Sequence, residues 1–231
     1  MTKRLAIIPA RGGSKRIPLK NIKPFNDRPI IAYSIEAALN SGLFSEVMVS
    51  TDDKQIAEVA LAHKASVPFF RSPENSNDYA GTAEVLCEVL SQYKNKKNEF
   101  SEACCIYPTA PFVTSTMLAE TYSIFSKGNY DTLFPIMKFS YPVPRSLKKN
   151  SSGGIEMVWP ENYSKRSQDL LPFYHDAGQF YWFKVPFMLQ EKKLFSQNSY
   201  GHEIDELHGQ DIDNLSDWKL AELKFNMISG L

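Results

Sequence analysis

The sequence predicts an α/β fold of the Rossmann-like type, with a mostly parallel sheet and helices on both faces. Short apolar runs of strand length alternate with segments whose apolar residues recur at helical spacing. This alternation is typical of parallel sheets joined by right-handed crossovers. At 231 residues the chain is also long enough for one large domain with a substantial core.

The expected elements follow one another from residue 5 to residue 137. Strands are expected at 5–8, 47–49, 67–70, 103–106 and 132–137, and helices around 31–39, 56–60, 85–90 and 117–125. Asp27 and Pro29 should start the first helix and Gly42 should end it. Thr51 or Asp52 should cap the second helix, because a polar side chain at that position can accept from the first free N–H groups.

The alternation stops near residue 140. Residues 140–175 contain Pro, Ser and Gly turns together with aromatic and apolar side chains. We interpret them as a small insertion that could cap a site, pair with another subunit, or do both, and we expect a homodimer. An aromatic strand at 178–183 and an amphipathic helix at 214–228 should complete a single domain spanning residues 1–231.

Composition narrows the class of protein. The 26 basic and 26 acidic residues cancel, which argues against nucleic acid or a membrane surface as partner. The three cysteines, Cys87, Cys104 and Cys105, form no metal-binding spacing and suit the core of a protein from a reduced compartment. No apolar run reaches the ~20 residues needed to cross a bilayer, so we expect a cytoplasmic protein.

A glycine-rich basic loop at residues 10–21 directly follows the first strand. Gly12 and Gly13 allow backbone amides to approach an anion closely. The loop also carries cations and polar donors, namely Arg11, Lys15, Arg16, Lys20, Ser14 and Asn21. It lacks the P-loop pattern G-x-x-x-x-G-K-[ST]. The loop therefore predicts a triphosphate site, although Lys15 and Arg16 taken alone could be surface cations.

Three further segments follow predicted strands, at 50–53, 71–82 and 107–113. In parallel sheets ligands bind outside the carboxyl ends of the strands. We therefore expect these segments to share one edge of the sheet with the loop at 10–21.

Several of these strings resemble the motifs of one enzyme family. The strings at 8–21, 49–53, 71–73, 107–111 and 211–213 are similar to those of the CMP-sialic acid synthetases, also called acylneuraminate cytidylyltransferases, which have a fold of the nucleotide-diphospho-sugar transferase type. The resemblance covers nearly the whole chain. The strings at 105–112, 166–170 and 174–182 are most similar to the branch that acts on pseudaminic acid.

One departure from the family pattern bears on the sugar. Tyr107 and Phe112 stand near polar positions of the sialic acid enzymes, in the string Tyr-Pro-Thr-Ala-Pro-Phe-Val. A more apolar pocket is expected, suited to a 9-deoxy, diacetamido sugar.

The resemblance implies transfer of CMP from CTP to the anomeric hydroxyl of a nonulosonic acid, with release of pyrophosphate, for glycan biosynthesis. It assigns the phosphoryl oxygens to Arg11 and Lys20, the triphosphate to a cradle of Ala10, Gly12, Gly13, Ser14, Lys15 and Asn21, and the cytosine to Arg71 and the backbone near Thr82. For the sugar it suggests Arg166 or Gln168 at the carboxylate, with Tyr107, Thr109, Asp176 and Gln179 near the pocket.

Asp211 and Asp213 alternate with Ile212, so on an extended backbone both carboxylates face one side. Hard oxygen ligands of this kind suit Mg²⁺, and the family match assigns the same role to both residues. The alternative is a helix cap, because Asp213 or Asn214 precedes the last expected helix.

Other functions fit parts of the same pattern. A rival within the class is a cytidylyltransferase for N-acetylneuraminic acid, legionaminic acid or a 3-deoxy-octulosonate. A rival outside it is a non-catalytic nucleotide-binding regulator, against which Lys20, Asp211 and Asp213 argue. His175 has polar neighbours and is either a site residue or a structural histidine.

Overall fold

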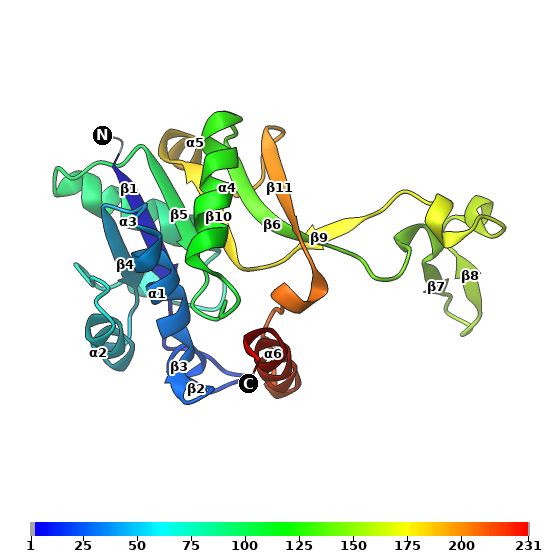
Figure 1. The fold of residues 1–231 in the computed structure, drawn as a ribbon, viewed down its shortest axis with the longest axis horizontal. Coiled ribbons are helices and arrows are strands. Elements are labelled where there is room, and N and C mark those ends of the chain that lie inside the picture. The colour runs from blue at the N-terminus through cyan, green and yellow to red at the C-terminus, as the bar shows by residue number, and fades with distance from the viewer. Residues whose placement is uncertain (1–2, 231) are drawn as a thin grey trace.

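A mixed sheet with the strand order β11–β6–β10–β5–β1–β4 forms the centre of the computed structural model, which describes residues 3–230 (Figure 1). Its strands are β1 (Arg4–Pro9), β4 (Glu46–Ser50), β5 (Glu102–Ile106), β6 (Thr132–Lys138), β10 (Phe180–Lys184) and β11 (Ser199–Ile204), and β9 (Tyr174–Asp176) pairs with β6 outside this order. β1 is parallel to both β4 and β5, and β11 is parallel to β6. β10 runs antiparallel between β5 and β6, and β9 is also antiparallel. The predicted α/β class is confirmed.

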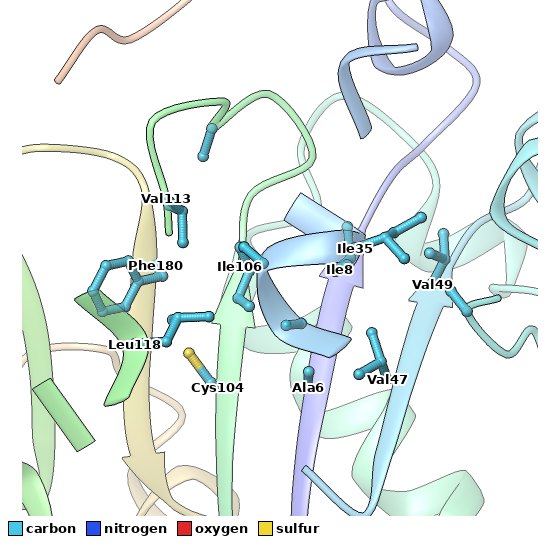
Figure 2. Close-up of a cluster of buried hydrophobic side chains, with 14 of the residues drawn as sticks. Ala6, Ile8, Ile35, Val47, Val49, Cys104, Ile106, Val113, Leu118 and Phe180 are labelled. Atoms are coloured by element: carbon cyan, nitrogen blue, oxygen red, sulfur yellow. The ribbon is translucent and has the colours of Figure 1, made fainter. Parts of the chain in front are cut away.

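Helices cover both faces of this sheet. They are α1 (Ile30–Ser41), α2 (Lys54–Ala62), α3 (Thr82–Asn95), α4 (Ser115–Lys127) and α5 (Val185–Glu191). The last helix, α6 (Leu215–Ser229), packs instead in a separate cluster with Phe25 and Ile30. Figure 2 shows one covered face, where Ala6 and Ile8 of β1 lie among buried side chains that include Ile35 of α1 and Leu118 of α4. The intervening Ile7 points to the other face and joins a second core cluster with residues of α3 and α5. Both faces of β1 are therefore buried, as parallel strands require.

Three local predictions were wrong. Residues 67–70 form no strand; only Ser66 bridges to Met48, and Pro68 lacks the N–H that a ladder needs. Asp27 lies with positive φ in the turn between β2 (Pro24–Phe25) and β3 (Arg28–Pro29), so α1 starts later, at Ile30. The N-cap of α2 is Asp53, whose carboxylate accepts from the N–H groups of Gln55 and Ile56.

The other boundaries agree with expectation. α1 ends at Gly42, whose φ of 64° is the left-handed conformation that glycine adopts without strain.

Short 3₁₀ helices complete the secondary structure. They are η1 (Lys20–Ile22), η2 (Pro73–Asn75), η3 (Val143–Arg145), η4 (Pro160–Asn162), η5 (Ser167–Asp169) and η6 (Glu206–His208). Within residues 3–230 no helix combines the length and apolarity needed to span a membrane.

The expected insertion forms an arm that projects from the body beside β9 and carries a small hairpin at its far end (Figure 1). The hairpin strands are β7 (Leu147–Lys149) and β8 (Ile155–Met157). The first and last residues of the arm lie side by side, because the N–H of Phe139 donates to the carbonyl of Phe173 at 3.0 Å. It exposes large apolar side chains, among them Tyr141, Leu147, Ile155, Tyr163 and Leu171.

Candidate active site

A cavity of about 540 Å³, here the first cavity, opens at the carboxyl ends of β1 and β5. Its walls come from the loop after β1, the segment 71–82 and the segment after β5. The predicted residues that line it are Arg11, Ser14, Lys15, Lys20, Asn21, Arg71, Thr82, Tyr107, Thr109 and Asp213. The predicted shared edge is therefore confirmed, because segments far apart in the sequence meet where the parallel strands end.

The loop at 10–21 is held in shape by groups around it. The N–H of Gly12 donates to a carboxylate oxygen of Asp52 at 2.9 Å, and the side-chain amide of Asn21 donates to the carbonyl of Arg11 at 2.9 Å. A β-carbon at Gly12 would lie 2.8 Å from a carboxylate oxygen of Asp53, so this close approach requires glycine. Nothing stands within 4 Å of a β-carbon built on Gly13. Ala10 is buried below the loop.

Three cations of the loop already have an anionic partner. Arg11 donates to a carboxylate oxygen of Asp78 at 2.9 Å, and Lys15 pairs with the other oxygen of the same group. Hydrogen bonds from Lys15 and Arg11 lower the pKa of Asp78. Arg16 pairs with Asp213 at 3.0 Å. The cavity therefore holds cations on one wall and carboxylates beside them.

Lys20 links the loop to the segment that carries the two predicted metal ligands. Its ammonium group donates to the carbonyl of Ile212 at 2.7 Å. Burial lowers the pKa of Lys20, while the charges of Asp213 and Asp211 oppose that shift. The side chain is thus partly withdrawn from water next to two carboxylates, where its charge acts with less screening.

Asp211 and Asp213 flank the fully buried Ile212. Asp213 lines the first cavity, whereas Asp211 lines a neighbouring one. Burial raises the pKa of Asp211, and the charge of Asp213 raises it further. Asn214 caps α6 in a capping box with Asp217, so neither Asp213 nor Asp211 is needed as the cap.

Two carboxylates that repel each other beside a phosphate loop fit a hard divalent cation. Within residues 3–230 no three His, Cys, Asp or Glu side chains are grouped to hold a metal. Phosphate oxygens and water would therefore have to supply the remaining ligands, as is usual for Mg²⁺.

Arg71 and Thr82 line the first cavity together with the basic loop at 10–21. Arg71 is 8% exposed, and its guanidinium donates to the hydroxyl of Ser50 at 3.1 Å and to the carbonyl of Ser50 at 2.5 Å. Burial lowers its pKa. The hydroxyl of Thr82 lies 3.0 Å from that of Tyr107, whose pKa is raised by burial to about 12. Both side chains are therefore fixed before any ligand arrives.

A second cavity of about 530 Å³ lies where β6 and β9 meet the segment 206–211. His175, Asp176, Asp211 and Lys224 line it. Asp176 accepts from the N–H of Gly178 at 2.9 Å and from the hydroxyl of the buried Tyr181 at 2.6 Å. It is therefore part of a rigid wall.

A third cavity of about 260 Å³ at the base of the arm shares three lining residues with the second, so the two are neighbours. The shared residues are Lys138, Phe139 and Ser140, and Gln168, Leu170, Leu171 and Phe173 also line the third cavity.

The residues predicted for the sugar are spread over these cavities and beyond them. Tyr107 and Thr109 line the first cavity, Asp176 the second and Gln168 the third. Arg166 is exposed on the arm and pairs with Asp169 at 2.8 Å.

Gln179 is 1% exposed, and its amide donates to the carbonyl of His208 at 2.5 Å. Its side-chain oxygen is buried and has no hydrogen-bond partner within the described residues. Phe112 corrects an expectation, because it packs in a core cluster with Phe25 and Trp218 and lines no described cavity.

Sequence reasoning missed two functional positions. Asp52, considered only as a helix cap, instead holds Gly12, and Asp78 pairs with the cations of the loop. The sequence does place Asp78 in the same edge segment as Arg71, which could have suggested a role in the site. Which cations it pairs with depends on the tertiary fold.

Comparison with known proteins identifies the class to which this site belongs. The cytidylyltransferase family matches residues 5–210, so the chain belongs to that family and is a nucleotidyltransferase of the CMP-sugar synthetase type. A pseudaminic acid cytidylyltransferase of Campylobacter jejuni is 39% identical over 97% of both chains. A CMP-N,N'-diacetyllegionaminic acid synthase of Legionella pneumophila is 32% identical over 94% of both chains.

A solved structure supports the fold. A CMP:2-keto-3-deoxy-manno-octonic acid synthetase in complex with CTP covers 100% of both chains with a TM-score of 0.71 at 18% identity. The predicted family membership is confirmed.

Proposed function

We propose that this enzyme transfers CMP from CTP to the anomeric hydroxyl of a nonulosonic acid, most specifically pseudaminic acid, and releases pyrophosphate. The observation that carries the proposal is the first cavity, which the basic loop at 10–21 lines together with Arg71, Thr82 and Asp213. The family match and the similarity to the Campylobacter jejuni enzyme support the reaction and the sugar.

The nucleotide is proposed to lie across the first cavity. Gly12, Gly13, Ser14 and Lys15, with Ala10 and Asn21 supporting them, would receive the triphosphate. The base would lie against Arg71 and the start of α3 at Thr82. A phosphate loop cannot distinguish bases, so these residues would have to select cytosine.

The reaction itself needs positioning and charge neutralisation more than covalent help from the protein. The sugar hydroxyl gives its proton to solvent and its oxygen attacks the α-phosphorus, so that a new C–O–P linkage forms. The bond from the α-phosphorus to the oxygen that bridges it to the β-phosphorus breaks, and pyrophosphate leaves. Arg11 and Lys20 would stabilise the charge that develops on the phosphoryl oxygens. Asp211 and Asp213 would hold Mg²⁺, which when bound supplies positive charge at phosphate and lowers the pKa of a bound hydroxyl.

The sugar is proposed to occupy the second and third cavities, with its anomeric end at Asp211. Asp211 supports this placement, because it lines the second cavity while the nearby Asp213 lines the first. The two residues would therefore connect the sugar cavity with the nucleotide cavity. Phe139, Leu171 and Phe173 give the third cavity an apolar wall, and Ser140 and Gln168 add polar groups. Such a lining suits acetamido and deoxy groups better than a fully hydroxylated chain.

We propose a homodimer formed through the arm. The exposed apolar side chains at 141–171 are typical of a surface that a partner covers. Arg166 and Gln168 remain our candidates for the sugar carboxylate. Because Arg166 is exposed and lines none of the three cavities, it would act through movement of the arm or in a second copy.

Pyrophosphate release tests the whole proposal. CTP should be turned over with pseudaminic acid, more slowly with legionaminic or N-acetylneuraminic acid, and ATP or GTP should be poor donors. Equal turnover with ATP or GTP would remove the cytidylyltransferase assignment. Binding of CTP without pyrophosphate release for any sugar acid would favour the regulator instead.

A further inference from the structure

Asp78 is an acid among the cations of the nucleotide cavity, and neither the family motifs nor the proposed reaction uses it. Its carboxylate lies on the wall of the first cavity and accepts from Arg11 and Lys15, one oxygen for each cation. A carboxylate in this position accepts charge-assisted hydrogen bonds from Arg and Lys, as a phosphate oxygen would, but carries less negative charge than a triphosphate.

The loop that carries Asp78 is ordered around it. The side-chain oxygen of Asn77 accepts from the N–H groups of Tyr79 and Ala80 at 2.8 and 3.1 Å, and its amide donates to the carbonyl of Glu74. Arg11 also donates to the carbonyl of Asn77 at 2.8 Å. The carboxylate is therefore presented to the phosphate loop by a formed turn and does not reach it as a loose chain end.

We propose that Asp78 is a specificity-determining residue that occupies the place of the terminal phosphates when no nucleotide is bound. A ligand must then bring enough negative charge to displace it from Arg11 and Lys15. This inference rests on the proposed placement of the triphosphate in the first cavity.

The charge balance explains what Asp78 would discriminate. A triphosphate offers several anionic oxygens to the two cations, whereas Asp78 offers one carboxylate, so CTP displaces it. CMP and the CMP-sugar carry phosphate only at the α position, so they can compete with Asp78 at Arg11 but have nothing to offer to Lys15. Asp78 competes with pyrophosphate in the same way and thereby promotes its release after the transfer.

The test compares Asp78→Asn with Glu74→Gln. Glu74 is an exposed acid of the same loop and is not a partner of Arg11 or Lys15, so its variant loses the same charge without the contact. The probes are CTP, CMP and inorganic pyrophosphate, titrated by calorimetry at fixed ionic strength. Because exposed ion pairs each contribute little, Asp78→Asn should bind CTP and pyrophosphate about 3–10-fold more tightly.

CMP affinity should rise less in Asp78→Asn than the affinities for CTP and pyrophosphate, and Glu74→Gln should resemble wild type with all three probes. Product inhibition by pyrophosphate should also strengthen in Asp78→Asn. Unchanged or weaker binding of CTP and pyrophosphate by Asp78→Asn would overturn the inference, as would tighter binding of CMP by the same factor.

Arg11→Ala separates this inference from the proposed function. If Arg11→Ala loses CTP affinity while Asp78→Asn behaves as wild type, the triphosphate lies where proposed and only the role of Asp78 fails. If Arg11→Ala also leaves CTP affinity unchanged, the placement of the triphosphate fails with it.

Discussion

The two sides of the active site are built in different ways. The nucleotide side is assembled from loops that leave parallel strands, and buried polar groups such as Asn21 and Arg71 fix them by hydrogen bonds. The sugar side lies between the antiparallel β9, the segment 206–211 and an arm that projects from the body. Its walls are partly exposed, and Arg166 pairs with Asp169 of its own turn.

This difference indicates which part of the site can change its substrate specificity most easily. A cavity whose walls are fixed by the sheet edge is suited to the part of the substrates that we expect family members to share. Cavities formed by an arm can change shape with little effect on the core, because few core residues contribute to them. The following predictions test whether the nucleotide side and the sugar side of the site behave as separate units.

The largest effect is expected at Lys20, which lies at the boundary of the two sides. Lys20→Met should lower kcat for pyrophosphate release by about 10²–10³-fold, the usual cost of losing one donor to a developing charge. The control is Lys23→Met, because Lys23 lies 5.2 Å from the ring centre of Trp218 and lines no described cavity. Equal losses in both variants would contradict a catalytic role.

A somewhat smaller effect is expected for Asp211→Asn and Asp213→Asn. Each should lose about 10²-fold in turnover, and raising Mg²⁺ should restore part of it at the weaker ligand. Both should melt near wild type, because Asn214 caps α6 without them. A variant that keeps wild-type turnover at low Mg²⁺ would show that its residue is not a ligand.

The pH dependence of unfolding gives this prediction a second measurement. The folded-state pKa of Asp211 is raised, so the fold favours its protonated form and the associated stability is lost as pH rises through that pKa. Without metal, Asp211→Asn should therefore melt at or slightly above wild type at neutral pH. Added Mg²⁺ should raise the melting temperature of wild type more than that of the variant.

Sugar selectivity tests the arm side directly. The apolar wall of the third cavity should favour pseudaminic acid over N-acetylneuraminic acid by about 10–200-fold in kcat/KM. Leu171→Ser should reduce this ratio while CTP affinity stays unchanged. Comparable kcat/KM for the two sugars in wild type would overturn the pseudaminic acid assignment.

The smallest effect is expected on nucleotide binding when the arm surface is changed. Ile155→Lys should convert a dimer into a monomer by light scattering and lower sugar turnover, because a buried charge would oppose association. CTP affinity should change by less than about twofold, since distant sites act independently. A wild-type monomer with full activity would refute the dimer.

Sequence reasoning succeeded for the fold and for the shared edge of the sheet, because both depend on local patterns. Strand and helix periodicity identified β1, β4, β5, β6 and α6 close to their observed bounds. The motif after β1 is continuous, so its residues stay together in any fold that keeps the strand. The strand predicted at residues 67–70 does not form. The next residue, Arg71, is instead held beside the sheet by a hydrogen bond from its N–H to the carbonyl of Thr51.

The sequence by itself determined the α/β class, the phosphate loop and the identity of its cations, because these depend on periodicity and on neighbouring residues. Only the tertiary structure decided that Asp78 meets Arg11 and Lys15, that Phe112 belongs to the core, and that Asp211 and Asp213 line different cavities. The physical reason is that burial and ion pairing are properties of positions in space. Residues 63 or 67 positions apart become partners only where the sheet brings the ends of its strands together.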